Sequence, residues 1–210
     1  MSPMPAGGSE KSRARAQARR ARILEAARKC FSERGFHGAS MARIGEEAGM
    51  SAGLIYRYFA SKAEIILAIT SEQRGMRMRA MAEVGSRLEL LDRILEKMRD
   101  WRVTGGQRGS FDPALFLEVT AEACRDPAIA ALVSAQEEEN CADMAQVIER
   151  EARAAGVSLS REALYRHAVL ARCLVEGVIL RCVRDPSLDL DQVRIALRTQ
   201  VLPLEDQVPV

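Results

Sequence analysis

The chain has 210 residues, of which 48% are apolar and 4% aromatic, and its formal net charge is +2. This length allows one small and one medium-sized domain with a substantial core. There is no run of 18 apolar residues and no apolar stretch after the N-terminal charges, so the composition excludes a membrane span and a signal peptide. We therefore expect a cytoplasmic protein without membrane contact.

The charge is unevenly distributed along the chain. Residues 1–62 hold 12 Lys and Arg against 5 Asp and Glu, whereas residues 63–210 hold 19 against 24. A basic first third followed by a mildly acidic remainder is typical of a DNA-facing domain attached to a body that does not contact DNA.

The N-terminal segment predicts a basic arm followed by a helix. Residues 1–15 are expected to be disordered, because the first ten contain Pro, Gly and Ser without any apolar period. The Arg-rich stretch 11–22 either reaches phosphates or the minor groove, or is only a solvated helix start, and the sequence leaves both open. Apolar residues at spacings of three and four predict the first helix over about 16–34, ended by Gly35.

Residues 40–62 predict a helix-turn-helix. Ser40 can cap a short helix, Gly49 can end it in the left-handed conformation, and Ser51 can cap a second short helix. Ser61 then opens a longer helix. This arrangement places a second helix in the DNA major groove. The expected core of this domain is Phe31, Phe36, Ile44, Ala48, Ile55 and Phe59.

The second short helix carries residues suited to a duplex. Its small first residues allow backbone N–H groups to approach a phosphate or base edge. Ser40, Arg43, Tyr58 and Lys62 are expected to bind phosphates, and Arg57 can grip guanine through two hydrogen bonds. The alternative is that the tyrosines are half-buried packing residues. The candidate DNA-binding residues are Ser40, Arg43, Ser51, Ala52, Gly53, Tyr56, Arg57, Tyr58 and Lys62.

Residues 20–69 resemble the DNA-binding domain of the TetR family of one-component bacterial transcriptional regulators. The matching residues are Ile23-Leu24-Glu25-Ala26-Ala27, Phe31, Gly35-Phe36, Ser40, Ile44, Ala48-Gly49-Met50-Ser51, Gly53, Ile55-Tyr56, Tyr58-Phe59 and Ser61-Lys62. They form a specific constellation over about a quarter of the chain. Gly45 stands where the family usually has Ala, and this glycine costs the helix about 1 kcal/mol of propensity. Ala52 and Ala60 replace residues that are often polar, which indicates sparse base readout.

The remaining sequence predicts six further helices and no strand. Their expected ranges are about 61–83, 86–103, 112–126, 127–155, 160–184 and 190–202, with a loop at 104–110. The predicted fold is all-α with about nine helices. Its domains are a basic arm (1–15), a three-helix helix-turn-helix domain (16–62) and a helical ligand-binding and dimerisation domain (63–210), as the TetR resemblance also implies.

Helices 160–184 and 190–202 are apolar on nearly all sides, so a second subunit is expected to cover one side. We expect a two-fold homodimer joined by a four-helix bundle, which also spaces two recognition helices for a palindromic operator. The candidate interface residues are Leu174, Val175, Val178, Ile179, Val193 and Leu197.

Polar residues within the apolar stripe of helix 127–155 suggest a pocket for a small-molecule effector of unknown identity. The candidate ligand-binding residues are Trp101, Phe116, Thr120, Gln136, Asn140, Met144 and His167, with Arg172 as an alternative to His167. The competing interpretation is that the aromatic residues are ordinary core.

These features predict a DNA-binding regulator, most simply a dimeric repressor that a small molecule releases from a palindromic double-stranded DNA operator. The alternative is a ligand-independent activator or architectural protein. An enzyme is not expected, because 137–139 is interpreted as a solvated charge run and no Glu-x-x-His occurs. The five cysteines lack a C-x-x-C pair and are expected to be buried free thiols, and the two histidines are far apart, so no metal or cofactor is assigned.

Overall fold

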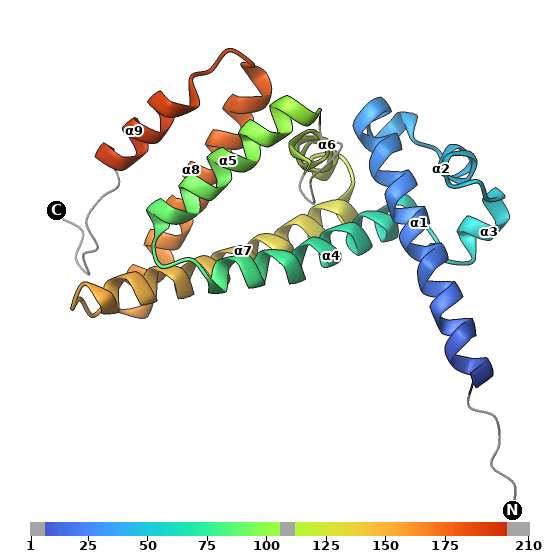
Figure 1. Ribbon diagram of the computed structural model, residues 1–210, viewed down its shortest axis with the longest axis horizontal. Helices are drawn as coiled ribbons and strands as arrows, with labels where there is room; N and C mark the ends of the chain where they lie inside the picture. Colours follow the sequence, from blue (N-terminus) through green and yellow to red (C-terminus); the bar gives the residue numbers. More distant parts are fainter. Residues whose placement is uncertain (1–6, 106–111, 201–210) are drawn as a thin grey trace, which may run out of the picture. The chain divides into compact units, whose positions relative to one another are not determined.

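The computed structural model describes residues 7–105 and 112–200, and these residues form nine helices and no strand (Figure 1). The prediction of an all-α fold is confirmed. Predictions for residues 1–6, for most of the loop at 104–110 and for the chain beyond 200 lie outside the described residues. The helices are α1 (Gly7–Gly38), α2 (Met41–Ala48), α3 (Ala52–Tyr56), α4 (Lys62–Ala82), α5 (Arg87–Thr104), α6 (Pro113–Ala123), α7 (Pro127–Ala154), α8 (Arg161–Arg184) and α9 (Leu190–Gln200).

The chain divides into two compact units, Met1–Ser71 and Glu72–Val210, and the division falls within α4. The boundary expected from the sequence lies earlier, after residue 62. The first turns of α4 belong to the first unit, where they bury Ile65, Ile66 and Ile69.

Helix α1 begins at Gly7, so the prediction of a disordered arm as far as residue 15 is wrong for residues 7–15. The physical reason is composition, because the Glu, Lys, Arg and Ala of residues 10–15 are strong helix formers. Gly35 has a positive φ (φ 68°, ψ 173°) and breaks the helical path, after which a last helical stretch reaches Gly38. The predicted stop at Gly35 therefore corresponds to a kink.

The first unit has the core that the sequence predicts. All six expected core residues are at most 7% exposed: Phe31, Phe36, Ile44, Ala48, Ile55 and Phe59. The rings of Phe31 and Phe36 stack with centroids 5.8 Å apart. This core fixes α2 and α3 on α1 and leaves their polar residues on the surface.

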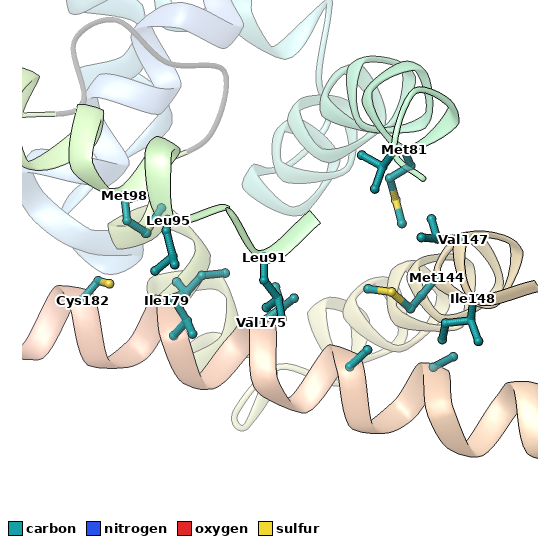
Figure 2. Packing of buried hydrophobic residues seen from close by; sticks show 14 of the residues in the cluster. Met81, Leu91, Leu95, Met98, Met144, Val147, Ile148, Val175, Ile179 and Cys182 are labelled. Carbon is teal, nitrogen blue, oxygen red and sulfur yellow. The ribbon is translucent and has the colours of Figure 1, made fainter. Parts of the chain in front are cut away.

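The second unit is built around one apolar cluster. Figure 2 shows Leu91, Leu95 and Met98 of α5 facing α8, which contributes Val175, Ile179 and Cys182. Helix α7 adds Met144, Val147 and Ile148, and Met81 comes from the end of α4. Phe116 of α6 and Val193 and Leu197 of α9 pack against this cluster.

Arginines tie the helix ends of this unit to one another. The largely buried Arg87 forms an ion pair with Glu151, with Nε 3.0 Å from Oε2, and thereby joins the start of α5 to α7. Arg150 donates to the carbonyls of Met81 and Val84, and Arg102 donates to three carbonyls around the end of α8, those of Cys182, Asp185 and Leu188. These bonds are made to carbonyl groups at, and just beyond, the C-terminal ends of α4 and α8.

The structure changes the predicted dimer interface. Val175, Val178 and Ile179 are buried in the chain's own core, so a second subunit could not contact them without displacing that core. Val193 and Leu197 also pack against the core, and Leu174 is half-buried. The prediction chose the most apolar stripe of α8 for the dimer interface. In the structure, that stripe packs in the chain's own core.

The cysteines only partly follow the prediction of buried thiols. All five are free, but only Cys30 and Cys182 are buried, whereas Cys141 is half-buried and Cys124 and Cys173 are exposed. Burial raises the pKa of the Cys30, Cys141 and Cys182 thiols.

Within the described residues, no helix combines the length and apolarity needed to cross a membrane.

Candidate nucleic-acid interface

The turn between α2 and α3 is built by short polar and small residues. Ser40 Oγ accepts a hydrogen bond from the Arg43 N–H (3.2 Å), and Ser51 Oγ accepts one from the Leu54 N–H (3.3 Å). Gly49 has φ 61° and ends α2 as predicted. Both predicted helix caps and the left-handed glycine are therefore confirmed.

Gly45 is a requirement of this turn. The Met50 N–H donates to the Gly45 carbonyl at 2.8 Å, and a Cβ added to Gly45 would lie 2.8 Å from the Met50 carbonyl oxygen and 3.4 Å from the Ala52 nitrogen. Glycine at position 45 lowers the helix propensity of α2. It also allows α2 to approach the start of α3 closely, which a residue with a Cβ would prevent.

Helix α3 presents the predicted base-reading residues to solvent. Ile55 and Phe59 are buried and anchor it, while Tyr56 is 56% exposed. Arg57 is exposed and stands at the C-terminal cap of α3, just after its last helical residue. Tyr58 is half-buried, so one of the two tyrosines combines packing with surface exposure.

The other candidate residues have different environments. Ser40, Arg43, Ser51 and Gly53 are exposed, and Ala52 is half-buried. The half-buried Lys62 places Nζ 2.7 Å from the Phe36 carbonyl oxygen and 4.2 Å from the centroid of the Phe36 ring. Lys62 thus fastens the start of α4 to the end of α1, a structural bond that the sequence does not predict.

Two arginines of α1 lie beside the helix-turn-helix. The guanidinium of Arg20 lies 4.9 Å from the centroid of the Phe59 ring. Nη2 of Arg22 lies 2.6 Å from the position that a Cβ on Gly49 would occupy, directly at the turn. From the sequence, both residues are expected only as part of a basic arm, because only the fold brings α1 to the turn.

In the second unit, a polar network joins α7 to α8. Arg172 binds both carboxylate oxygens of Glu137, at 2.8 Å each, and its Nη2 lies 2.9 Å from Oε1 of Glu176. Interpreting residues 137–139 as a solvated charge run was therefore wrong for Glu137, which is half-buried. The sequence signal was a single arginine within the apolar stretch 168–179.

Burial and charge act against each other within this network. Burial alone would raise the pKa of Glu137, but the hydrogen bonds and charge of Arg172 hold that pKa below its ordinary value. For Glu176, burial raises the pKa, and Arg172 opposes this only in part. Burial would lower the pKa of Arg172, but Glu137 and Glu176 raise it. Arg172 therefore stays charged.

The candidate ligand residues lie in several different environments. Gln136 and Asn140 join the network, with a 3.4 Å bond between them and a further bond from Asn140 to Glu137. Phe116 and Met144 share the apolar cluster, as the competing core interpretation expects. Thr120 is exposed, with its hydroxyl donating to the Phe116 carbonyl. The remaining two candidates, Trp101 and His167, are half-buried.

The fold and this site define a helix-turn-helix protein of the DNA-binding class. Residues 23–69 match the family model described as bacterial regulatory proteins, tetR family. The HTH-type transcriptional repressor Rv1474c of Mycobacterium tuberculosis is 30% identical over 181 residues, which cover 85% of this chain and 83% of that protein. The chain belongs to the TetR family.

Other relatives match over shorter lengths. The HTH-type transcriptional regulator UidR of Escherichia coli is 36% identical over 119 residues, 56% of this chain. The matched region spans only 58% of UidR, the first of the curated relatives. Among solved structures, GusR of Salmonella enterica has a TM-score of 0.68 and 26% identity, and the match covers 87% of this chain and 94% of that one.

Within residues 7–105 and 112–200, no group of three or more His, Cys, Asp or Glu side chains is arranged to hold a metal ion.

Proposed function

We propose that this protein is a transcriptional regulator, a dimeric repressor that binds a palindromic operator and is released by a small molecule. The observation that supports this most directly is the α2–α3 turn, which anchors α3 through Ile55 and Phe59 and leaves Tyr56 and Arg57 exposed. In such an arrangement a guanidinium can read guanine in the major groove.

The proposed dimer uses the outward face of α8 and α9. Leu170 and Leu180 of α8 are 42% and 40% exposed, and Ile195 of α9 is 54% exposed. Cys173 and Gly177 lie between the two leucines, are exposed, and are small enough to allow close helix packing. We name Leu170, Cys173, Gly177, Leu180 and Ile195 the outer stripe, and propose that a second copy of this chain covers it.

The proposed effector acts on the second unit. Two structures of similar fold have small molecules in their titles: a regulator from Saccharomonospora viridis in complex with choline, at 22% identity, and FadR from Bacillus subtilis in complex with stearoyl-CoA, at 16% identity. These likenesses support a fold that can accept a small molecule. A coupling of about 1–3 kcal/mol between effector and DNA would be sufficient.

DNA binding can be tested without a known operator. The purified protein is used to select duplexes from a random-sequence library, and Arg57→Ala is then measured on the selected duplex and on a scrambled one. We expect Arg57→Ala to lose about 1–3 kcal/mol of discrimination, the usual value of one bidentate base contact. Arg161→Ala, an exposed arginine of the second unit, is the control that should keep full discrimination. Failure to select any sequence would reject the proposed function, and unchanged discrimination would remove Arg57 from the groove.

Effector binding needs a separate experiment. A metabolite library is screened for compounds that raise the melting temperature, and each hit is tested for release of the selected duplex. A compound that stabilises the protein and weakens DNA binding is the expected result. If stabilising compounds leave DNA affinity unchanged, the ligand-independent alternative is favoured.

A further inference from the structure

The first half of α1 is a basic helix without an apolar face. Residues 10–22 are all exposed, and between Gly7 and Arg22 there are six Lys and Arg, one Glu and no apolar residue larger than Ala. Figure 1 shows this part of α1 extending beyond α2 and α3 within the first unit. Packing against the chain's own core therefore does not account for it.

Four of these cations form one stripe. Lys11, Arg15, Arg19 and Arg22 are separated by four, four and three residues, and helical geometry places residues at such spacings on a single face. Like charges at these spacings destabilise an isolated helix by about 0.2–0.5 kcal/mol per pair. Among the residues that the structure describes, no carboxylate forms an ion pair with any of the four. The basic stripe thus lacks a neutralising partner within the described chain.

The basic stripe leads away from the recognition turn. Its last member, Arg22, lies at Gly49, between α2 and α3. From Lys11 to Arg22 the helix rises about 16 Å, at 1.5 Å per residue. One strand of DNA places a phosphate about every 3.4 Å, so the stripe matches the backbone of about five base pairs.

We infer that the basic stripe binds the phosphate backbone of double-stranded DNA beside the sequence that α3 reads. This inference rests on the proposed function and adds a second, sequence-independent contact to it. Guanidinium and ammonium groups on one helical face complement a row of phosphates. The contact extends the bound DNA beyond the recognised bases and raises affinity without changing sequence preference.

An anionic membrane is the less suitable polyanion. Helices that lie in a membrane interface carry large apolar residues such as Trp, Phe or Leu opposite their basic face. Residues 7–22 contain none of these. The composition therefore favours a rigid row of phosphates over a lipid surface.

The test compares Arg15→Ala/Arg19→Ala with Lys97→Ala/Arg161→Ala in the full chain. Each variant loses two exposed cations, the first pair from the basic stripe and the second from α5 and α8 of the second unit. Two duplexes are used, one ending at the outermost selected base pair and one with a further helical turn of DNA on each side. Affinity is measured across a salt series, and circular dichroism checks the helix content.

We expect the stripe variant to bind the long duplex at least about tenfold more weakly. Its salt slope should fall by about 3.6 per dimer, which is about 0.9 for each of the four lost phosphate contacts, two in each subunit. On the short duplex both variants should bind like the wild type. Selectivity between selected and scrambled long duplexes should be unchanged, and hydroxyl-radical protection should retreat to the selected sequence.

If the two variants bound the long duplex with equal affinity and equal salt slope, the inference would be overturned. The proposed function would still stand if the wild type selected a specific sequence. Loss of binding to vesicles of anionic lipid, with unchanged binding to the long duplex, would also overturn it.

Discussion

A single glycine sets the spacing of the DNA-binding helices. At Gly45 the backbone of α2 comes so close to the Met50 carbonyl that a methyl group has no room, and neither contacting backbone group can rotate away. Steric exclusion here outweighs helix propensity. The position of α3 in the first unit therefore depends on residue 45 having no side chain.

Gly45→Ala should destabilise the protein. Overpacking costs about 1–3 kcal/mol and exceeds the roughly 1 kcal/mol that alanine gains in helix propensity. Because the clash pushes α3 from its position, affinity for the selected duplex should fall as well. Urea unfolding and DNA titration measure the two effects.

Gly53→Ala is the matched control for stability. A Cβ at Gly53 meets nothing within 4 Å, and its backbone is helical. Its unfolding free energy should stay equal or rise by up to about 1 kcal/mol. If Gly45→Ala were as stable as Gly53→Ala, the steric explanation of Gly45 would be wrong.

At the scale of helices, one ion network fixes the contact between α7 and α8. Arg172 is largely buried and binds Glu137 through two bonds and Glu176 through one. Without the guanidinium, two half-buried carboxylates would remain close together without a counter-charge. Leaving buried charge unpaired is costly, which makes Arg172 the critical member.

Arg172→Met should lower the unfolding free energy at neutral pH by about 1–3 kcal/mol. Fully buried pairs lose about 3–5 kcal/mol, and the smaller value is expected because both carboxylates are more than a third exposed. Arg153→Met breaks the exposed pair with Glu149 and should change stability by less than about 0.5 kcal/mol. Equal losses in the two variants, measured by urea unfolding, would contradict this role of Arg172.

The loss caused by Arg172→Met should depend on pH. Arg172 lowers the pKa of Glu137 in the folded protein, so its stabilisation is fully present above the ordinary glutamate pKa of about 4.3. It disappears as the pH falls through the lowered value, because Glu137 then becomes neutral. The difference between wild type and variant should shrink in acid, and a difference that grows there would refute the assignment.

At the scale of the whole molecule, the outer stripe supports the proposed dimer. Leu180→Glu places a charge on this exposed face and should yield monomers in sedimentation, with unchanged helix content. Val103→Glu, at another exposed apolar position, should keep the dimer. Val178→Glu would bury a charge in the core and should unfold the protein instead. A Leu180→Glu protein that still forms dimers would exclude Leu180 from the interface.

The helices, their caps and the core of the first unit could be predicted from the sequence, because they depend on local signals. Ser40, Ser51 and Gly49 act on neighbouring backbone groups, and the core residues recur with the helical period. The pairing of Glu137 with Arg172 could not be predicted, because 35 residues separate them and α7 must first pack on α8. The sequence could not show which side of α8 faces the chain's own core, because two sides of that helix are apolar.

The sequence by itself determined that this chain is all-α, carries a helix-turn-helix in a basic first third and resembles TetR regulators. Periodicity, capping residues and charge act over a few positions, and the order of residues is sufficient to specify them. Only the tertiary structure decided which stripe of α8 remains outside, why Gly45 must lack a side chain, and where Arg22 lies relative to the turn. These features depend on contacts between distant segments, which exist only once the helices have packed.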